Sequence, residues 1–135
     1  MSVCGPKLAT VEIDGVTYHL APETLARTLA RTSPAARVHL LPGFDEYLLG
    51  YGDRSAALAP EYSAAVVPGS NGVFKPTIVA DGAVVGTWTR KTTAREIVIE
   101  PFPFERPSGS VRAGLAEAAQ ALGAFLGRPT RLAGP

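Results

Sequence analysis

Apolar and polar residues alternate on both sides of an Asp-Gly pair near the start of the chain. Residues 10–13 read Thr-Val-Glu-Ile, residues 16–20 read Val-Thr-Tyr-His-Leu, and Asp14-Gly15 separates them. An Asp-Gly pair between two alternating segments is a strong signal for a two-residue β-turn. The pattern therefore predicts a β-hairpin.

Helical spacing replaces the alternation after this hairpin. Leu25 and Leu29 lie four positions apart in a segment that begins at Pro22, so we expect about three helical turns over residues 22–32. The elements expected next are a strand at 37–41, short helices at 44–51 and 59–66, and a loop at 68–72.

A second Asp-Gly pair divides two longer apolar segments in the middle of the chain. Residues 73–80 and 83–90 flank Asp81-Gly82, and residues 95–102 supply a third extended segment. Segments of this kind, joined by short turns, predict an antiparallel meander.

The second hairpin can be given a register by assuming that Asp81-Gly82 is a two-residue loop. Ala80 then lies opposite Ala83, and Lys75 lies opposite Trp88. The face expected to point into the core carries Phe74, Pro76, Ile78, Ala80, Ala83 and Val85. The face that a partner could touch carries Val73, Lys75, Thr77, Val79, Val84, Trp88 and Arg90.

The last element expected is a helix over residues 110–127 that lies across the sheet. Gly127 and Pro129 are suited to end it. The apolar stripe of this helix comprises Val111, Leu115, Ala118, Leu122 and Phe125. The whole pattern predicts an α+β fold with a mostly antiparallel sheet and two or three helices. We expect one domain over residues 9–127, a disordered lead at 1–8 and a tail at 128–135.

Composition narrows the class of protein more than its function. A chain of 135 residues is long enough to bury a core without metal or disulfide support. The single cysteine, Cys4, suits a reducing cytoplasm, and no apolar segment is long enough for a membrane span or a signal peptide. We therefore expect a soluble, cytoplasmic protein with no membrane partner.

The net charge of +1 conceals a basic segment. Residues 73–95 contain Lys75, Arg90, Lys91 and Arg95 but only one acid, Asp81. A tryptophan among cations suits nucleic acid, because cations bind phosphates and an aromatic face stacks on bases. Lys75, Trp88, Arg90 and Lys91 are therefore the candidate DNA contacts. The alternatives are that Trp88 anchors the core and that the charged strand end is only solvated.

No residue pattern indicates a catalytic, metal or cofactor site. His19 and His39 stand alone on separate expected strands, without the spacing that a zinc site needs. Ser70 lies outside any nucleophile motif, and no glycine-rich loop precedes a helix in the arrangement that cradles phosphates. We therefore expect no catalytic residue, no metal and no cofactor.

The acidic and aromatic residues between Leu40 and Ser55 have structural explanations. Asp45 is expected to cap the short helix, and Asp53 to cap the next turn or to pair with an arginine such as Arg54. Tyr47 and Tyr51 lie one helical turn apart, where they could stack on a base or bridge core and surface.

Two motifs in the centre of the chain nevertheless resemble a known family. The first comprises Leu40, Leu41, Pro42, Phe44, Asp45, Tyr47, Leu48, Tyr51, Asp53 and Arg54. The second comprises Gly72, Phe74, Pro76, Thr77, Asp81, Gly82, Gly86 and Trp88. Together they resemble the C-terminal part of winged-helix DNA-binding proteins that include the AlkZ-type DNA glycosylases. The resemblance covers residues 9–127.

The resemblance implies a part of a DNA-repair protein without its catalytic centre. The catalytic Gln-x-Gln or Gln-x-Asp motif of that family belongs to the N-terminal part, and the only glutamine here, Gln120, has no such neighbour. We therefore expect a non-catalytic DNA-binding accessory domain.

Two other functions are left open by the sequence. One is a structural module that docks on winged-helix domains or a partner protein through an apolar patch near Leu48, Leu49 and Tyr51. The other is a small-molecule binder or enzyme that uses a pocket between helix and sheet.

Overall fold

The computed structural model describes residues 8–13, 15–30, 37–70 and 72–134. The chain divides into two compact units, Met1–Pro34 and Ala35–Pro135, which are described in turn.

The first unit contains the predicted hairpin and helix. Strands β1 (Ala9–Ile13) and β2 (Val16–Leu20) pair antiparallel, and Ile13 lies opposite Val16, as a two-residue loop requires. Asp14 itself lies outside the described residues. Helix α1 (Pro22–Leu29) begins with proline in its first turn and buries none of its residues. The helix was predicted to continue to residue 32, but Ala30 is its C-cap, and residues 31 and 32 lie outside the described part.

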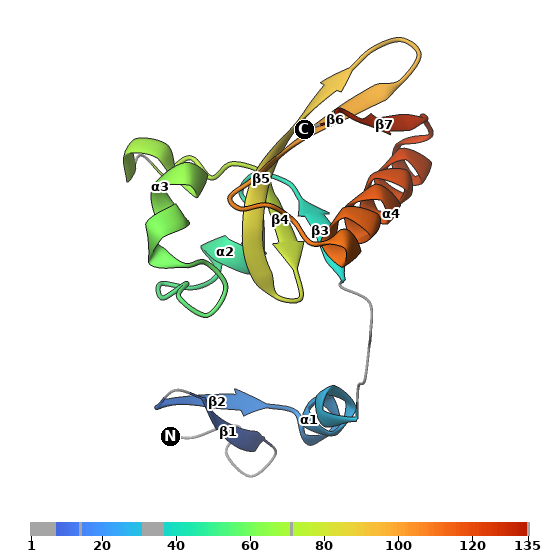
Figure 1. The fold of residues 1–135 in the computed structure, drawn as a ribbon. Coiled ribbons are helices and arrows are strands. Elements are labelled where there is room, and N and C mark those ends of the chain that lie inside the picture. Colours follow the sequence, from blue (N-terminus) through green and yellow to red (C-terminus); the bar gives the residue numbers. More distant parts are fainter. Residues whose placement is uncertain (1–7, 14, 31–36, 71, 135) are drawn as a thin grey trace. The chain divides into compact units, whose positions relative to one another are not determined.

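The second unit is built on a five-stranded sheet with the order β3-β4-β5-β6-β7 (Figure 1). All neighbouring strands are antiparallel except β6 and β7, which are parallel. The bounds are β3 Val38–Leu41, β4 Thr77–Ala80, β5 Ala83–Thr92, β6 Ile97–Pro103 and β7 Thr130–Leu132. The predicted α+β fold with a mostly antiparallel sheet is confirmed. Strand β7, however, lies within residues 128–135, where we expected a tail.

Helix α4 (Gly109–Leu126) covers one face of this sheet (Figure 1). Ser108 caps it by accepting a hydrogen bond from the Val111 N–H, and Gly127 ends it in the left-handed conformation. Its buried face packs on Val38, Ile78, Trp88, Ile97 and Ile99 through Val111, Leu115, Ala119, Leu122 and Leu126. The predicted stripe was wrong at Phe125, whose side chain is 85% exposed.

Short helices cover the other face of the sheet (Figure 1). They are α2 (Glu46–Leu49), the 3₁₀ turn η2 (Pro60–Tyr62), α3 (Ser63–Val66) and a second 3₁₀ turn, η3 (Pro68–Ser70). The core on this side contains Leu48, Leu58, Val66, Phe74, Val79 and Val84. Both faces of β4 are therefore buried, which makes its four residues uniformly inaccessible.

The predicted register of the second hairpin holds only near its turn. Ala80 lies opposite Ala83, but a β-bulge between Ile78 and Val79 shifts the remaining pairs by one residue. The Trp88 N–H consequently donates to the Pro76 carbonyl, so the prediction that Lys75 lies opposite Trp88 is wrong.

The predicted division of this hairpin into a core face and an open face is also wrong. Val79 and Val84 are buried against the short helices, whereas Trp88 is buried against α4. The cause is that helices cover both sides of the sheet, so an apolar run replaces alternation in β4.

None of the helices in the described ranges combines the length and the apolar character needed to cross a lipid bilayer.

Candidate nucleic-acid interface

The segment between Leu40 and Ser55 is held by its own polar side chains. Asp45 caps α2, as predicted, by accepting a hydrogen bond of 2.9 Å from the Tyr47 N–H. Leu48, on the same short helix, is buried in the core below. A helix of four residues is too short to be stable alone, so the cap and the buried leucine position it.

Tyr47 joins α2 to the turn between β4 and β5. Its hydroxyl donates a hydrogen bond to the Gly82 carbonyl oxygen. Burial of the phenol raises the pKa of Tyr47, and the nearby Tyr51 raises it further. Tyr47 therefore remains a neutral donor at physiological pH.

Arg54 and Asp53 also act within the fold. The Arg54 Nε donates to the Leu48 carbonyl oxygen at 2.6 Å, and its guanidinium lies 5.1 Å from the centre of the Phe74 ring. Asp53 accepts a hydrogen bond from the Ser55 N–H at 2.9 Å, and this contact lowers the pKa of the carboxyl group. Of the two predicted roles, Asp53 therefore caps the turn, and it forms no ion pair with the described arginines.

Exposed aromatic side chains remain on this segment after the structural contacts are assigned. Phe44 is 56% exposed and Tyr51 is 65% exposed, whereas Leu48 is buried. An apolar patch was predicted near Leu48, Leu49 and Tyr51; Leu48 is buried, whereas Phe44, Leu49 and Tyr51 are exposed.

Trp88 is not available for contact with a base. Its side chain is only 5% exposed and packs in the core under α4. The indole Nε1 donates to the Leu41 carbonyl oxygen at 2.8 Å, so the polar atom of the ring is satisfied inside the protein. Trp88 therefore anchors the core, which was the alternative interpretation, and is not a DNA contact.

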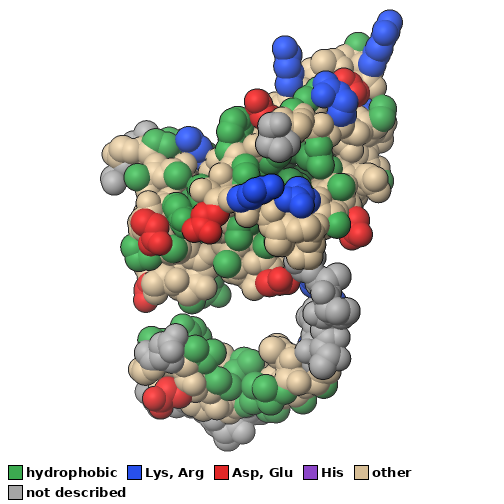
Figure 2. Space-filling view, in the orientation of Figure 1, with side chains coloured by type: hydrophobic (Ala, Val, Ile, Leu, Met, Phe, Trp, Pro, Cys, Tyr) green, Lys and Arg blue, Asp and Glu red, His purple; other side chains and the backbone are tan. Residues whose placement is uncertain are grey.

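Three exposed cations lie close together in the sequence at the outer end of the β5–β6 hairpin. Arg90 and Lys91 lie near the C-terminal end of β5, and Arg95 lies in the loop that joins β5 to β6; we call these three residues the basic end. All three are exposed, and Figure 2 shows Lys and Arg side chains projecting from this part of the molecule. Their side chains form no ion pair or hydrogen bond with the described residues. Lys75 is also exposed, but it precedes β4 and lies outside the basic end.

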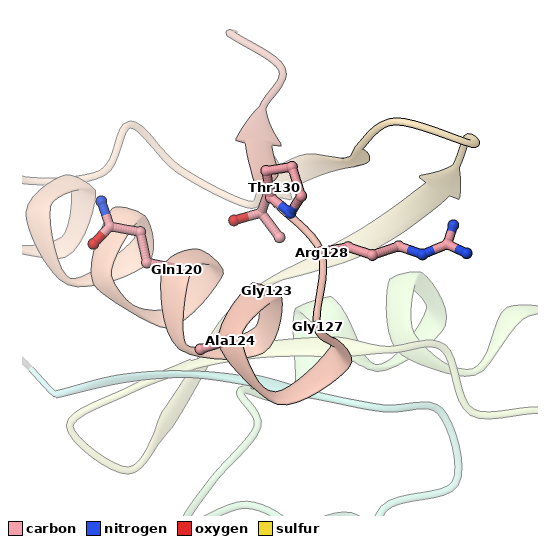
Figure 3. Close-up of a pocket in the computed structure, with 7 residues that line it drawn as sticks. Gln120, Gly123, Ala124, Gly127, Arg128 and Thr130 are labelled. Atoms are coloured by element: carbon pink, nitrogen blue, oxygen red, sulfur yellow. The ribbon is translucent and has the colours of Figure 1, made fainter.

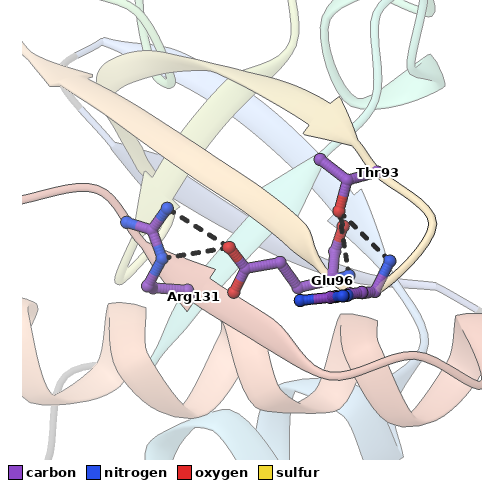
Figure 4. A network of polar contacts seen from close by, with 4 residues as sticks. Thr93, Glu96 and Arg131 are labelled. Atoms are coloured by element: carbon purple, nitrogen blue, oxygen red, sulfur yellow. Dashed lines mark hydrogen bonds and ion pairs between the residues drawn. The ribbon is translucent and has the colours of Figure 1, made fainter.

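Two arginines near the C-terminus bind the loop of the β5–β6 hairpin. The sequence analysis did not identify either of them as a site residue. Arg128 Nη1 donates to the Thr93 carbonyl oxygen at 2.8 Å. Arg131 pairs with Glu96, with 3.3 Å between Arg131 Nε and Glu96 Oε1 (Figure 4). Both arginines follow α4, and only the pairing of β7 with β6 brings them here.

A shallow surface depression lies where α4 ends and the chain returns toward β7 (Figure 3). It is lined by Gln120, Gly123, Ala124, Gly127, Arg128, Pro129 and Thr130. Its polar side chains belong to Gln120, Arg128 and Thr130. Arg128 and Thr130 are engaged in hydrogen bonds, the latter with the Ala119 carbonyl oxygen. This depression offers no converging set of reactive groups.

Among the residues that the structure describes, no three His, Cys, Asp or Glu side chains could hold a metal ion together. His19 lies on β2 of the first unit, and His39 lies exposed on β3 of the second. Gln120 is exposed on α4.

Comparison with known proteins identifies clear relatives. The family model described as "DNA glycosylase AlkZ-like" matches residues 4–125. The chain is 40% identical over 100 residues to an interstrand DNA cross-link repair glycosylase from Streptomyces sahachiroi, a match that covers 73% of this chain and 26% of the relative.

A solved structure of a related glycosylase is also similar to this chain. The structure of Streptomyces sahachiroi DNA glycosylase AlkZ is similar with a TM-score of 0.65 and 32% sequence identity. The match covers 96% of this chain and 34% of that chain. The chain therefore spans about a third or less of the length of these relatives.

Proposed function

This chain belongs to the DNA glycosylase AlkZ-like family, and we propose that it supplies DNA contacts, but no catalytic residue, to a DNA-repair protein of that family. Within this proposal it corresponds to a C-terminal part that works beside winged-helix domains. The proposed location is the cytoplasm, as the single cysteine suggests.

The observation that carries this proposal is the basic end of the β5–β6 hairpin. Arg90, Lys91 and Arg95 are exposed, and no carboxylate of the described residues pairs with them. Exposed, unpaired cations on a strand end can neutralise phosphates and release the counterions bound to DNA. The proposed contacts are therefore with the backbone and carry no sequence preference.

The proposed absence of catalysis rests on the sequence. The glutamine motif of the resembling glycosylases has no counterpart here, since Gln120 stands without a second polar partner in the motif spacing. Removal of a base requires activation of water or of the leaving base, and the resemblance assigns this step to that motif.

The decisive variant removes two cations of the basic end together. We expect Arg90→Ala/Lys91→Ala to weaken binding of a lesion-free, fluorescein-labelled 20-base-pair duplex, measured by anisotropy between 50 and 200 mM KCl. The slope of log K against log salt should fall in magnitude by about 1.8, because each lost phosphate contact removes about 0.9.

A charge-matched control separates local contact from net charge. Arg106→Ala/Arg112→Ala removes the same charge from exposed positions beside the N-terminal end of α4. We expect this control to keep the slope of the wild type. Equal slopes for all three proteins, or no binding by the wild type, would contradict the proposal.

A docking module is the second candidate, and the exposed aromatic patch favours it. Phe44 and Tyr51 project from the family motif although the remainder of that motif is tied into the fold. Exposed aromatic groups of this kind are enriched at protein interfaces. Failure of the wild-type chain to bind duplex DNA would favour this candidate.

A further inference from the structure

We propose that Arg131 is a further phosphate contact and that Glu96 occupies it until DNA displaces the carboxylate. The inference rests on the proposed function, because it adds a residue and a built-in competitor to the same DNA-binding surface. Neither residue belongs to the motifs that identify the family, and Arg131 lies beyond residue 125, where the family match ends.

Strand pairing places Arg131 beside the basic end. Lys91 of β5 lies opposite Val98 of β6, and Val98 lies opposite Arg131 of β7. Residues opposite one another share a face of a sheet, so the two cations flank Val98 on one face, about 10 Å apart from strand to strand. All three residues line the same shallow surface depression.

At β6 this face of the sheet is open: α4 covers the opposite face, and the short helices pack on this face around Val79 and Val84 instead. The neighbours of Val98 along β6, Ile97 and Ile99, are buried against α4, whereas Val98 is only half-buried. A ligand can therefore approach Lys91 and Arg131 from the same side without moving the helix.

The contact that now occupies Arg131 is weak and exchangeable. Glu96 Oε1 accepts from both Nε and Nη2 of Arg131 at 3.3 Å (Figure 4). The two side chains are 56% and 37% exposed, so water screens the pair. A guanidinium binds a phosphate in the same forked geometry as a carboxylate, and a duplex offers many phosphates to one Glu96.

The position of Glu96 is set by the hairpin loop. Its carbonyl oxygen accepts from the Thr93 N–H at 2.9 Å and from the Thr93 hydroxyl at 2.8 Å. The Thr93 hydroxyl oxygen also accepts from the Glu96 N–H at 3.0 Å. Glu96 is therefore held where it meets Arg131, and its carboxylate acts as an internal substitute for phosphate.

A double-mutant cycle tests this inference. The four proteins are the wild-type chain, Glu96→Gln, Arg131→Ala and the double variant, measured with the same labelled, lesion-free duplex across the same salt range. We expect Glu96→Gln to tighten binding about two- to fivefold, as loss of an exposed ion pair allows. Arg131→Ala should weaken binding and lower the magnitude of the salt slope by about 0.9.

The cycle distinguishes release of Arg131 from simple loss of a negative charge. If Glu96 acts through Arg131, most of the gain from Glu96→Gln disappears in the Arg131→Ala background. Glu100→Gln is the matched control, because Glu100 lines the same depression without an ion pair to a described residue. We expect a smaller gain for Glu100→Gln than for Glu96→Gln.

Every other outcome contradicts the inference, and each one identifies which part of it is wrong. Equal gains for Glu96→Gln with and without Arg131, or equal gains for Glu96→Gln and Glu100→Gln, would show that only general repulsion is relieved. Wild-type binding with no effect of Arg131→Ala would remove Arg131 from the surface and leave the proposed function standing. A wild-type chain that does not bind the duplex would overturn both.

Discussion

At the scale of single residues, the polar groups of the first motif mostly form contacts within the fold. Asp45, Asp53 and Arg54 each satisfy backbone groups of their own segment, and Tyr47 reaches the neighbouring turn. The Asp45 cap could be predicted because capping depends on residues two or three positions away. The Arg54–Phe74 contact could not, since it joins residues that only the fold brings together.

Arg54→Ala tests the importance of these supports. It removes a charge-assisted hydrogen bond to Leu48 and a cation–π contact to Phe74, so we expect it to lower the free energy of unfolding by about 2 kcal/mol. Urea unfolding can be followed by fluorescence of Trp88, the only tryptophan, which is buried in the second unit. Arg106→Ala, at an exposed site, serves as the control; a loss no larger than that of the control would show that Arg54 is dispensable.

Trp88 shows why a single residue can be misread from sequence. Trp88 was predicted to lie on an open face because the register was assumed to continue without interruption. One extra residue in a strand moves the side chains beyond it to the opposite face of the sheet. The bulge lies where Ile78 pairs with Gly86 and Val79 pairs with Val84, and the isolated Gly86 is the one sequence signal that could have indicated it. Arg90 and Lys91 were predicted as exposed cations and are exposed, since they lie at the strand end beyond the helices.

At the scale of elements, α4 and its return to β7 determine where the basic surface lies. The helix and both hairpins could be predicted from apolar spacing and Asp-Gly turns. Strand β7 could not, because three residues carry too little periodicity to be distinguished from a tail. Its pairing with β6 nevertheless brings Arg128 and Arg131 to the hairpin loop.

Gly123→Ala tests this close passage of the chain across α4. A Cβ at Gly123 would lie 2.7 Å from the Arg128 carbonyl oxygen and 2.9 Å from the Thr130 side chain (Figure 3). Alanine normally favours a helix interior over glycine by about 1 kcal/mol, but overpacking of this kind costs about 1–3 kcal/mol. We therefore expect a net loss of stability in urea unfolding.

Gly109→Ala is the matched control on the same helix. The Cβ there meets only the end of the Arg112 side chain, at 3.9 Å. We expect this variant to be neutral or slightly more stable than the wild type. A stabilising effect of Gly123→Ala would mean that the return to β7 is free to move away.

At the scale of the whole molecule, the chain matches only part of each longer relative. It spans about a third or less of its relatives, and its two compact units are a hairpin with one helix and a sheet covered by helices on both faces. The α+β class followed from the sequence because it depends on many local patterns at once. The proposed DNA surface followed only in part, because it combines a predicted strand end with residues from an unpredicted strand.

The central claim is that this surface holds DNA while no bond is broken, and one measurement addresses both halves. The 135-residue chain is incubated with intact and alkylated duplexes, and binding and base release are recorded on the same samples across a range of salt. We predict equal binding of both duplexes, a slope of log K against log salt between about −2.7 and −3.6 for three or four phosphate contacts, and no abasic sites. Accumulation of abasic sites, or a binding constant that does not respond to salt, would contradict the account.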